Sequence, residues 1–355
     1  MLVVASLAFC SWFFYSVYEQ RNGGSSTEDI GISGENSKRL RTEVRSWFRQ
    51  TFPASAARAD ENFGIFEFDR GDLPVTRSEW VLLAHGLDEP GNLWANLAPA
   101  LVDDGYRVME FRYPNDQPIQ ESSLLLKAQT ELLLSDDGLK APPSGIHLVG
   151  HSMGGLVFRN FVTHPELLPT CSWTIHTSVI SLVQLGTPNH GSWLATYRLP
   201  VELRDHLFKD FGLDAILGMV WDGAGEAQID IKPESVFLKN LNSRTFPKSI
   251  YWVGVAGIGS PVNLQQVQSW SGWKGSAFSG SLNDLQNTFP ELFLGTGDGC
   301  VSVDSLKCED MDAVFFVDAT HRSMVRDSRN DLPPAIPIVL EVLEKNKTSE
   351  DLIVK

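Results

Sequence analysis

A short stretch of the sequence decides the fold: Gly150-His151-Ser152-Met153-Gly154-Gly155. It follows an apolar run at 146–149 and comes directly before a helical pattern at 153–163. A strand that turns sharply into a helix holds its serine in a strained conformation, and neighbouring glycines let strand and helix pass closely. Ser152 is therefore predicted to be a nucleophile above a sheet, at the positive end of the next helix. The alternative is a glycine-rich turn with an idle serine.

Short apolar runs lie on both sides of this turn along the chain. They are rich in β-branched and aromatic residues, which is typical of strands buried on both faces. Helical patterns lie between them, and this alternation predicts an α/β fold with a mostly parallel, doubly wound sheet. The predicted strands are 80–84, 107–111, 145–149, 178–185, 250–256 and 313–317, with a weaker one at 63–68, and the predicted helices are 93–101, 122–134, 153–163 and 337–345.

The loop after the predicted strand 80–84 reads His85-Gly86-Leu87-Asp88. A tetrahedral intermediate on a serine needs an amide donor from the next residue and a second one from such a loop. We therefore predict an oxyanion hole made by the backbone amides of Leu87 and Met153. His85 precedes the nucleophile in the chain, so it is expected to brace the loop rather than to act as the base.

The base and the acid are predicted from chain order, which is serine, then Asp or Glu, then histidine. Of the eight histidines, only His321 lies beyond the last predicted strand, in a loop that could swing over the carboxyl edge of the sheet. The acid is expected in the loop before that strand, where Asp298 stands between glycines. Glycines suit a tight turn that buries a carboxylate against an imidazole. Asp304 and Asp318 are the alternatives.

These segments together resemble the α/β-hydrolase superfamily, and more narrowly its lipase-like branch. That branch includes bacterial triacylglycerol lipases and glycosylphosphatidylinositol-deacylase-like lipases. The resemblance runs from about residue 80 to residue 345 and rests on His85-Gly86-Leu87, the serine turn, Leu185-Gly186-Thr187-Pro188-Asn189-His190-Gly191-Ser192 and Gly297-Asp298-Gly299. It implies an α/β-hydrolase fold that cleaves carboxylic esters, with lipid-like acyl esters as substrates and with neither cofactor nor metal.

A helical pattern replaces the strands at about 190–235, with Leu203, Leu207 and Phe211 on one face. An insert at this point is either a lid that lines an acyl pocket or a segment that packs on the core. The four cysteines are too few for a disulfide scaffold and have no C-x-x-C spacing typical of metal sites. Cys300 and Cys308 lie close enough in the chain to bridge, and free thiols are the alternative.

The first residues carry a different pattern from the rest. Residues 2–18 contain no charged side chain, which predicts a single-pass membrane anchor within 1–20, with an export signal as the alternative. Residues 21–60 are predicted to be a linker followed by a basic amphipathic helix, which lies on anionic lipid or packs on the globular part. The hydrolase domain is expected to cover 61–355. The expected location is a membrane, or otherwise the periplasm or the exterior.

Composition excludes several classes of protein. Apolar residues make up 43% and charged residues 21% of the chain, which excludes a wholly disordered chain. The net charge of −15 argues against nucleic acid as a partner, because the backbone phosphates would be repelled. The predicted function is therefore a serine hydrolase of lipid-like carboxylic esters. The alternatives are a thioesterase or acyltransferase with the same triad, or a catalytically silent membrane-tethered binding module.

Overall fold

The computed structural model describes residues 62–87, 92–114, 117–134, 142–192, 226–260, 287, 290–326 and 332–350. The predicted anchor, linker and basic helix lie outside these residues, as does most of the predicted insert. Within the described ranges, no helix combines the length and the apolar character needed to cross a membrane.

A single sheet of seven strands forms the centre of the described part of the chain, in the order β1-β3-β2-β4-β5-β6-β7. All neighbouring strands are parallel except β1, which pairs antiparallel with β3 at one edge. The strands are β1 (Gly64–Glu67), β2 (Trp80–Ala84), β3 (Arg107–Arg112), β4 (Gly145–His151), β5 (Ser178–Leu185), β6 (Tyr251–Gly257) and β7 (Ala313–Val317).

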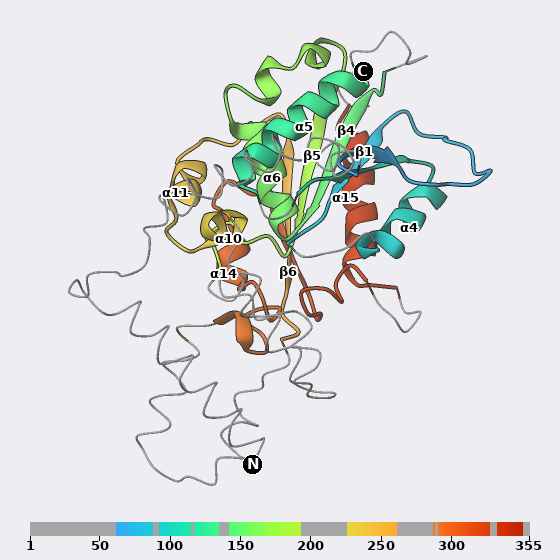
Figure 1. Ribbon diagram of the computed structural model, residues 1–355. Coiled ribbons are helices and arrows are strands. Elements are labelled where there is room, and N and C mark those ends of the chain that lie inside the picture. Colours follow the sequence, from blue (N-terminus) through green and yellow to red (C-terminus); the bar gives the residue numbers. More distant parts are fainter. Residues whose placement is uncertain are drawn as a thin grey trace, which may run out of the picture. The chain divides into compact units, whose positions relative to one another are not determined.

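Helices cover both faces of this sheet, with α5 and α6 on one side and α4 and α15 on the other (Figure 1). The alternation along β2 explains the two layers, because Leu82 faces the core under α5 and α6 while Val81 and Leu83 face the opposite core. The helices are α4 (Leu97–Asp103), α5 (Ile119–Leu134), α6 (Met153–Thr163), α10 (Glu226–Ile231), α11 (Val236–Asn242), α14 (Val303–Leu306) and α15 (Ala335–Glu350), with 3-10 turns at Leu93–Ala95, Leu168–Thr170, Ser172–Ile175 and Pro290–Leu292.

The predicted α/β class with a mostly parallel, doubly wound sheet is confirmed. The boundaries of some elements differ from the prediction. Helix α5 begins at Ile119 rather than at 122, because the Ile119 amide donates to Asp230 Oδ2 at 3.0 Å. A distant side chain thus satisfies the first amide of the helix.

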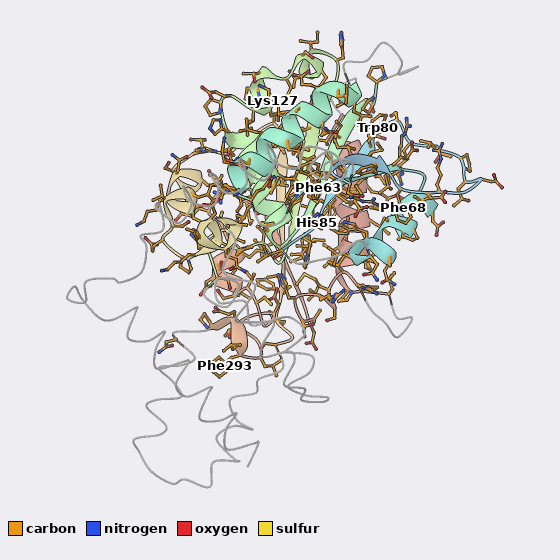
Figure 2. The ribbon with its side chains drawn as sticks, in the orientation of Figure 1. Phe63, Phe68, Trp80, His85, Lys127 and Phe293 are labelled. Atoms are coloured by element: carbon orange, nitrogen blue, oxygen red, sulfur yellow. The ribbon has the colours of Figure 1, made fainter. Side chains whose placement is uncertain are left out.

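The strand order places a functional site at one end of the sheet. The connection after β2 leads outward to β3, whereas β4 returns to the other side of β2, so the winding direction reverses between β2 and β4. In open α/β sheets, ligands bind beyond the carboxyl ends of the strands at such a reversal. Figure 2 labels a residue at each end of β2: Trp80 begins the strand, and His85 follows its last residue at the carboxyl end. The serine turn lies at this end of β4.

Candidate active site

Ser152 joins β4 to α6 in a backbone conformation that side chains other than glycine rarely adopt. Its φ of 52° and ψ of −124° place it in the left-handed half of conformational space, and its amide donates to the Leu185 carbonyl at 2.8 Å. Such a conformation costs about 1–3 kcal/mol and persists only where the surrounding structure enforces it. The structure therefore shows the strained serine turn that the sequence predicts, with the serine partly exposed.

The glycines beside the serine are required by close packing. A Cβ atom on Gly154 would lie 2.1 Å from the Ala84 carbonyl oxygen, and one on Gly150 would lie 2.5 Å from the Gly155 nitrogen. No side chain fits at such distances, so the first turn of α6 lies directly against the ends of β2 and β4. This packing brings the start of α6 next to the loop that contains His85 and Leu87.

The predicted acid and base form a buried pair. His321 Nδ1 lies 2.7 Å from Asp298 Oδ2, and both side chains are almost fully buried. Asp298 Oδ1 accepts hydrogen bonds from the amides of Cys300 (2.8 Å) and Val301 (2.7 Å), so both carboxylate oxygens have partners. An ionised carboxylate only accepts, so Nδ1 is the donor and Nε2 is the ring nitrogen left to accept a proton.

His151, the residue directly before Ser152 in the chain, helps to position this pair. Its Nε2 donates to the His321 carbonyl at 2.8 Å, and the two rings lie 4.6 Å apart. The His321 amide in turn donates to the Asp298 carbonyl at 2.8 Å. The predicted base, His321, is therefore fixed at its backbone on one side by the loop of Asp298 and on the other by the strand that precedes Ser152. The sequence analysis assigned no role to His151.

The alternative acids lie elsewhere. Asp304 and Asp318 are both exposed, whereas Asp298 is 1% exposed and faces the imidazole. Gly186, at the end of β5, also faces the pair, because a Cβ atom there would lie 2.9 Å from Asp298 Oδ2 and 3.0 Å from His321 Nδ1. A side chain at this position would compete with the imidazole for its place.

The predicted oxyanion donors lie at the same end of the sheet. Met153 is the first residue of α6, so its amide has no acceptor within the helix. Leu87 is partly buried in the loop after β2 and packs on the core under α6. His85 stacks on Tyr113 with ring centroids 4.4 Å apart, and the Tyr113 hydroxyl donates to the His85 carbonyl at 2.5 Å. These contacts fit the bracing role expected of His85.

The Gly-Thr-Pro segment after β5 is tied to the acid loop. Asn189 Nδ2 donates to the Leu306 carbonyl at 2.7 Å, and Ser192 Oγ donates to the Cys300 carbonyl at 2.5 Å. Asn189 is held from the other side by Arg159, which is buried over the Trp252 ring. Burial lowers the pKa of Arg159. The two loops are therefore one hydrogen-bonded unit around Asp298.

The three cysteines in the described residues form no disulfide bonds. Cys300 and Cys308 are therefore not bridged, and Cys308 Sγ lies 3.9 Å from His190 Nε2 instead. Asp298, Cys300 and His321 are the one group in the described residues whose ligand atoms could hold a metal ion, all within 4.8 Å of one another. The sequence analysis expected no metal here, and that expectation stays a prediction.

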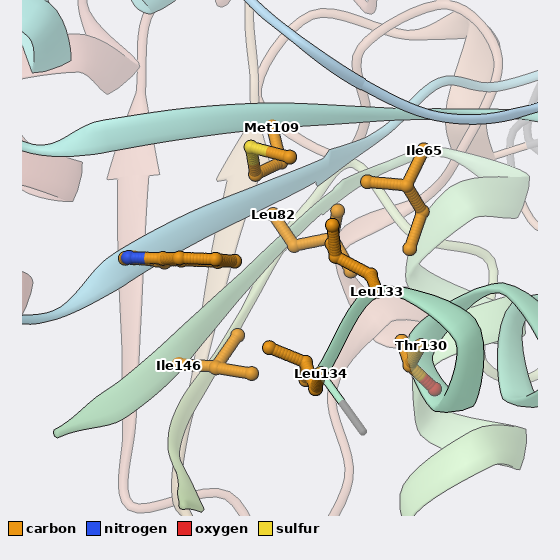
Figure 3. A pocket seen from close by; sticks show the side chains of 8 residues that line it. Ile65, Leu82, Met109, Thr130, Leu133, Leu134 and Ile146 are labelled. Carbon is orange, nitrogen blue, oxygen red and sulfur yellow. The ribbon is translucent and has the colours of Figure 1, made fainter. Parts of the chain in front are cut away.

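A small apolar pocket, partly open to solvent, lies at the opposite end of the sheet (Figure 3). It has no titratable side chain, so it offers no group for acid-base or nucleophilic chemistry. It is lined by Ile65, Trp80, Leu82, Met109, Thr130, Leu133, Leu134 and Ile146.

Comparisons with known proteins agree with this architecture. The family model of the PGAP1-like alpha/beta domain matches residues 122–210, which include the serine turn. No curated protein matches the chain in sequence.

The similar solved structures include the lipase BlEst2 of Bacillus licheniformis. Its mature form is 18% identical with a TM-score of 0.52, over 79% of this chain and 97% of that one. Its propeptide form is 17% identical with a TM-score of 0.52, over 77% of this chain and 53% of that one. The chain thus spans about half of the propeptide form. At this identity the likeness concerns the fold alone, and the protein has an α/β-hydrolase fold similar to that of this bacterial lipase.

Proposed function

We propose that this protein is a serine hydrolase that cleaves carboxylic esters. The observation that carries the proposal is the buried pair of Asp298 and His321, which is hydrogen-bonded to His151, the residue directly before the strained Ser152 in the chain. Strained backbone persists only where the surrounding structure enforces it and is common at active sites, and here it falls on a serine, whose hydroxyl can serve as a nucleophile.

The chemistry follows from these positions. Ser152 Oγ attacks the acyl carbon while His321 Nε2 takes its proton, and Asp298 holds the imidazole in the required tautomer. The amides of Leu87 and Met153 stabilise the negative oxygen of the tetrahedral intermediate. His321 then returns the proton to the departing alcohol, and water releases the acid from the acyl-enzyme by the same steps in reverse order.

Lipid-like acyl esters are the proposed substrates. Support comes from the fold shared with a bacterial lipase and from the apolar insert that the sequence predicts after His190. A thioesterase or an acyltransferase would use the same groups and would differ in the acceptor or the leaving group. Membrane attachment through residues 1–20 is part of the proposal, and deletion of 1–21 should release an active enzyme from the membrane fraction.

Labelling of the full chain with a fluorophosphonate probe tests the proposal. The wild type should be labelled and should hydrolyse p-nitrophenyl esters, with a preference for longer acyl chains. Ser152→Ala should lose both properties, whereas Ser243→Ala, which changes an exposed serine, should keep both. An unlabelled wild type would leave the silent binding module as the better description. Labelling that persists in Ser152→Ala would reject the assigned nucleophile.

A further inference from the structure

Cys300 brings a third kind of ligand to the acid and base. A carboxylate oxygen of Asp298, the Cys300 sulfur and a ring nitrogen of His321 all lie within 4.8 Å of one another. Thiolate, imidazole and carboxylate are the ligands that zinc takes in proteins, with three protein ligands and a water in open sites. We propose that Asp298, Cys300 and His321 form an inhibitory site for zinc or a similar soft divalent cation.

The backbone of this loop is already fixed for such a site. The Cys300 amide donates to Asp298 Oδ1 at 2.8 Å, and the Cys300 carbonyl accepts from Ser192 Oγ at 2.5 Å. The thiol can therefore move mainly by rotation about one bond. Tetrahedral zinc needs its ligand atoms about 3.3–3.6 Å apart, so a pair up to 4.8 Å apart closes with a movement of about 1.5 Å or less, whereas Nδ1 of His321 and Oδ2 of Asp298, now 2.7 Å apart, must separate by about 0.6 Å.

The partners around the three side chains support ligation. Asp298 Oδ1 keeps the amide of Val301 as a donor at 2.7 Å while Oδ2 faces the imidazole. His151 and the Asp298 carbonyl hold the backbone of His321. Hydrogen bonds of this kind orient ligand side chains, and their loss typically weakens a metal site about 10–100-fold.

The inhibitory effect, unlike the site itself, rests on the proposed function. Nδ1 of His321 faces Asp298 Oδ2 at 2.7 Å, so a metal bound between them requires the single ring proton to move through water from Nδ1 to Nε2, while the Cys300 thiol releases its proton to solvent. With its proton on Nε2, the imidazole cannot accept the proton of Ser152. A chelator that removes the metal restores the original tautomer.

Cobalt binding tests the site without any need for activity. Co²⁺ titrated into the full chain should bind and produce a thiolate-to-cobalt charge-transfer band, which zinc should displace. Cys308→Ser is the matched control, because Cys308 is also a partly buried thiol near a histidine, and it should keep the band. Cys300→Ser should lose the band and bind at least about tenfold more weakly, since a ligand contributes no less than its supporting hydrogen bonds. A band that survives in Cys300→Ser, or the absence of binding to the wild type, would overturn the site.

Two further measurements complete the test. Anomalous scattering from zinc-soaked crystals of the wild type locates the metal without a substitution, and zinc bound away from these three side chains would reject the proposal. Zinc should reduce ester hydrolysis by the wild type and by Cys308→Ser. In Cys300→Ser, the factor by which zinc reduces the rate should be at least tenfold smaller than in the wild type. If the chain hydrolyses no ester, the cobalt spectrum still decides whether the metal site exists.

Discussion

Strand β4 contains two buried histidines on one face, and their surroundings differ. His147, in the first half of the strand, lies 2.8 Å from Ser181 Oγ and meets the edge of Tyr106. His151, at the carboxyl end, donates to the carbonyl of His321, which is far away in the sequence. Burial lowers the pKa of His147 to about 4, so this histidine stays neutral and acts in packing. His151 instead joins the turn of Ser152 to His321.

The surroundings of the two histidines differ because the neighbouring strands continue beside one of them and end beside the other. Around His147 the neighbouring strands continue, so its partners are residues already fixed by strand register, such as Ser181. Around His151 the strands end, and the loops after β5, β6 and β7 enter the space above them. Reactive groups therefore gather at the carboxyl ends, whereas the same residue type inside the strand is part of the core.

The largest expected effect belongs to the carboxyl end. Ser152→Ala and His321→Ala should each reduce ester hydrolysis on the order of a million-fold, because the triad acts as a unit. His147→Gln, which keeps a group able to bond to Ser181, should leave turnover within about threefold of the wild type. Steady-state rates on a p-nitrophenyl ester provide the measurement. A comparable loss in His147→Gln would break the distinction between the two ends of β4.

Asp298→Asn should reduce the rate of ester hydrolysis about ten-thousand-fold, since an amide disturbs the tautomer of His321 but leaves nucleophile and base in place. Asp304→Asn and Asp318→Asn are the matched controls, because both carboxylates are exposed, and both should retain the wild-type rate. The assignment of the acid would fail if either control lost turnover while Asp298→Asn kept it.

His151→Leu sharpens the comparison by removing a donor and leaving an apolar side chain of similar size. The base would lose the hydrogen bond to its carbonyl, and a displacement of about 1 Å costs up to about a hundredfold in rate. The loss should appear in kcat with KM nearly unchanged, and a urea unfolding curve checks that the variant is folded. An unchanged kcat would show that His151 only fills space.

The smallest effect concerns His147 and pH. Its pKa is about 4 in the fold and about 6.5 in the unfolded chain, so only the unfolded chain takes up the proton between these values. The free energy of unfolding should fall as pH drops below 6.5, by about 2 kcal/mol from this residue between pH 7.5 and pH 5. Urea unfolding at pH 7.5 and pH 5 measures how far the free energy of unfolding falls. This fall should be smaller by about 2 kcal/mol in His147→Gln than in the wild type. His176→Gln, on an exposed histidine, should behave like the wild type.

Sequence patterns predicted the sheet well because its strands are continuous apolar runs. Chain order and loop glycines pointed to Asp298 and His321, which the structure brings together, although their catalytic roles stay predictions. The contact of His151 and the position of Cys300 escaped prediction because both depend on loops that meet only in the folded chain. The start of α5 did so for the same reason, since its cap comes from Asp230.

The distance along the chain between the parts of the site has a consequence for protein synthesis. His321, the proposed base, contacts His151 beside the serine turn, and the two residues are 170 positions apart in the chain. Strand β7 completes the sheet, and helix α15, which covers one of its faces, ends only at residue 350. A growing chain on the ribosome thus exposes its serine turn long before the acid and base have been made. On the proposed function, the growing chain cannot cleave an ester during that time, and activity begins only after the segment that contains β7 and α15 has emerged.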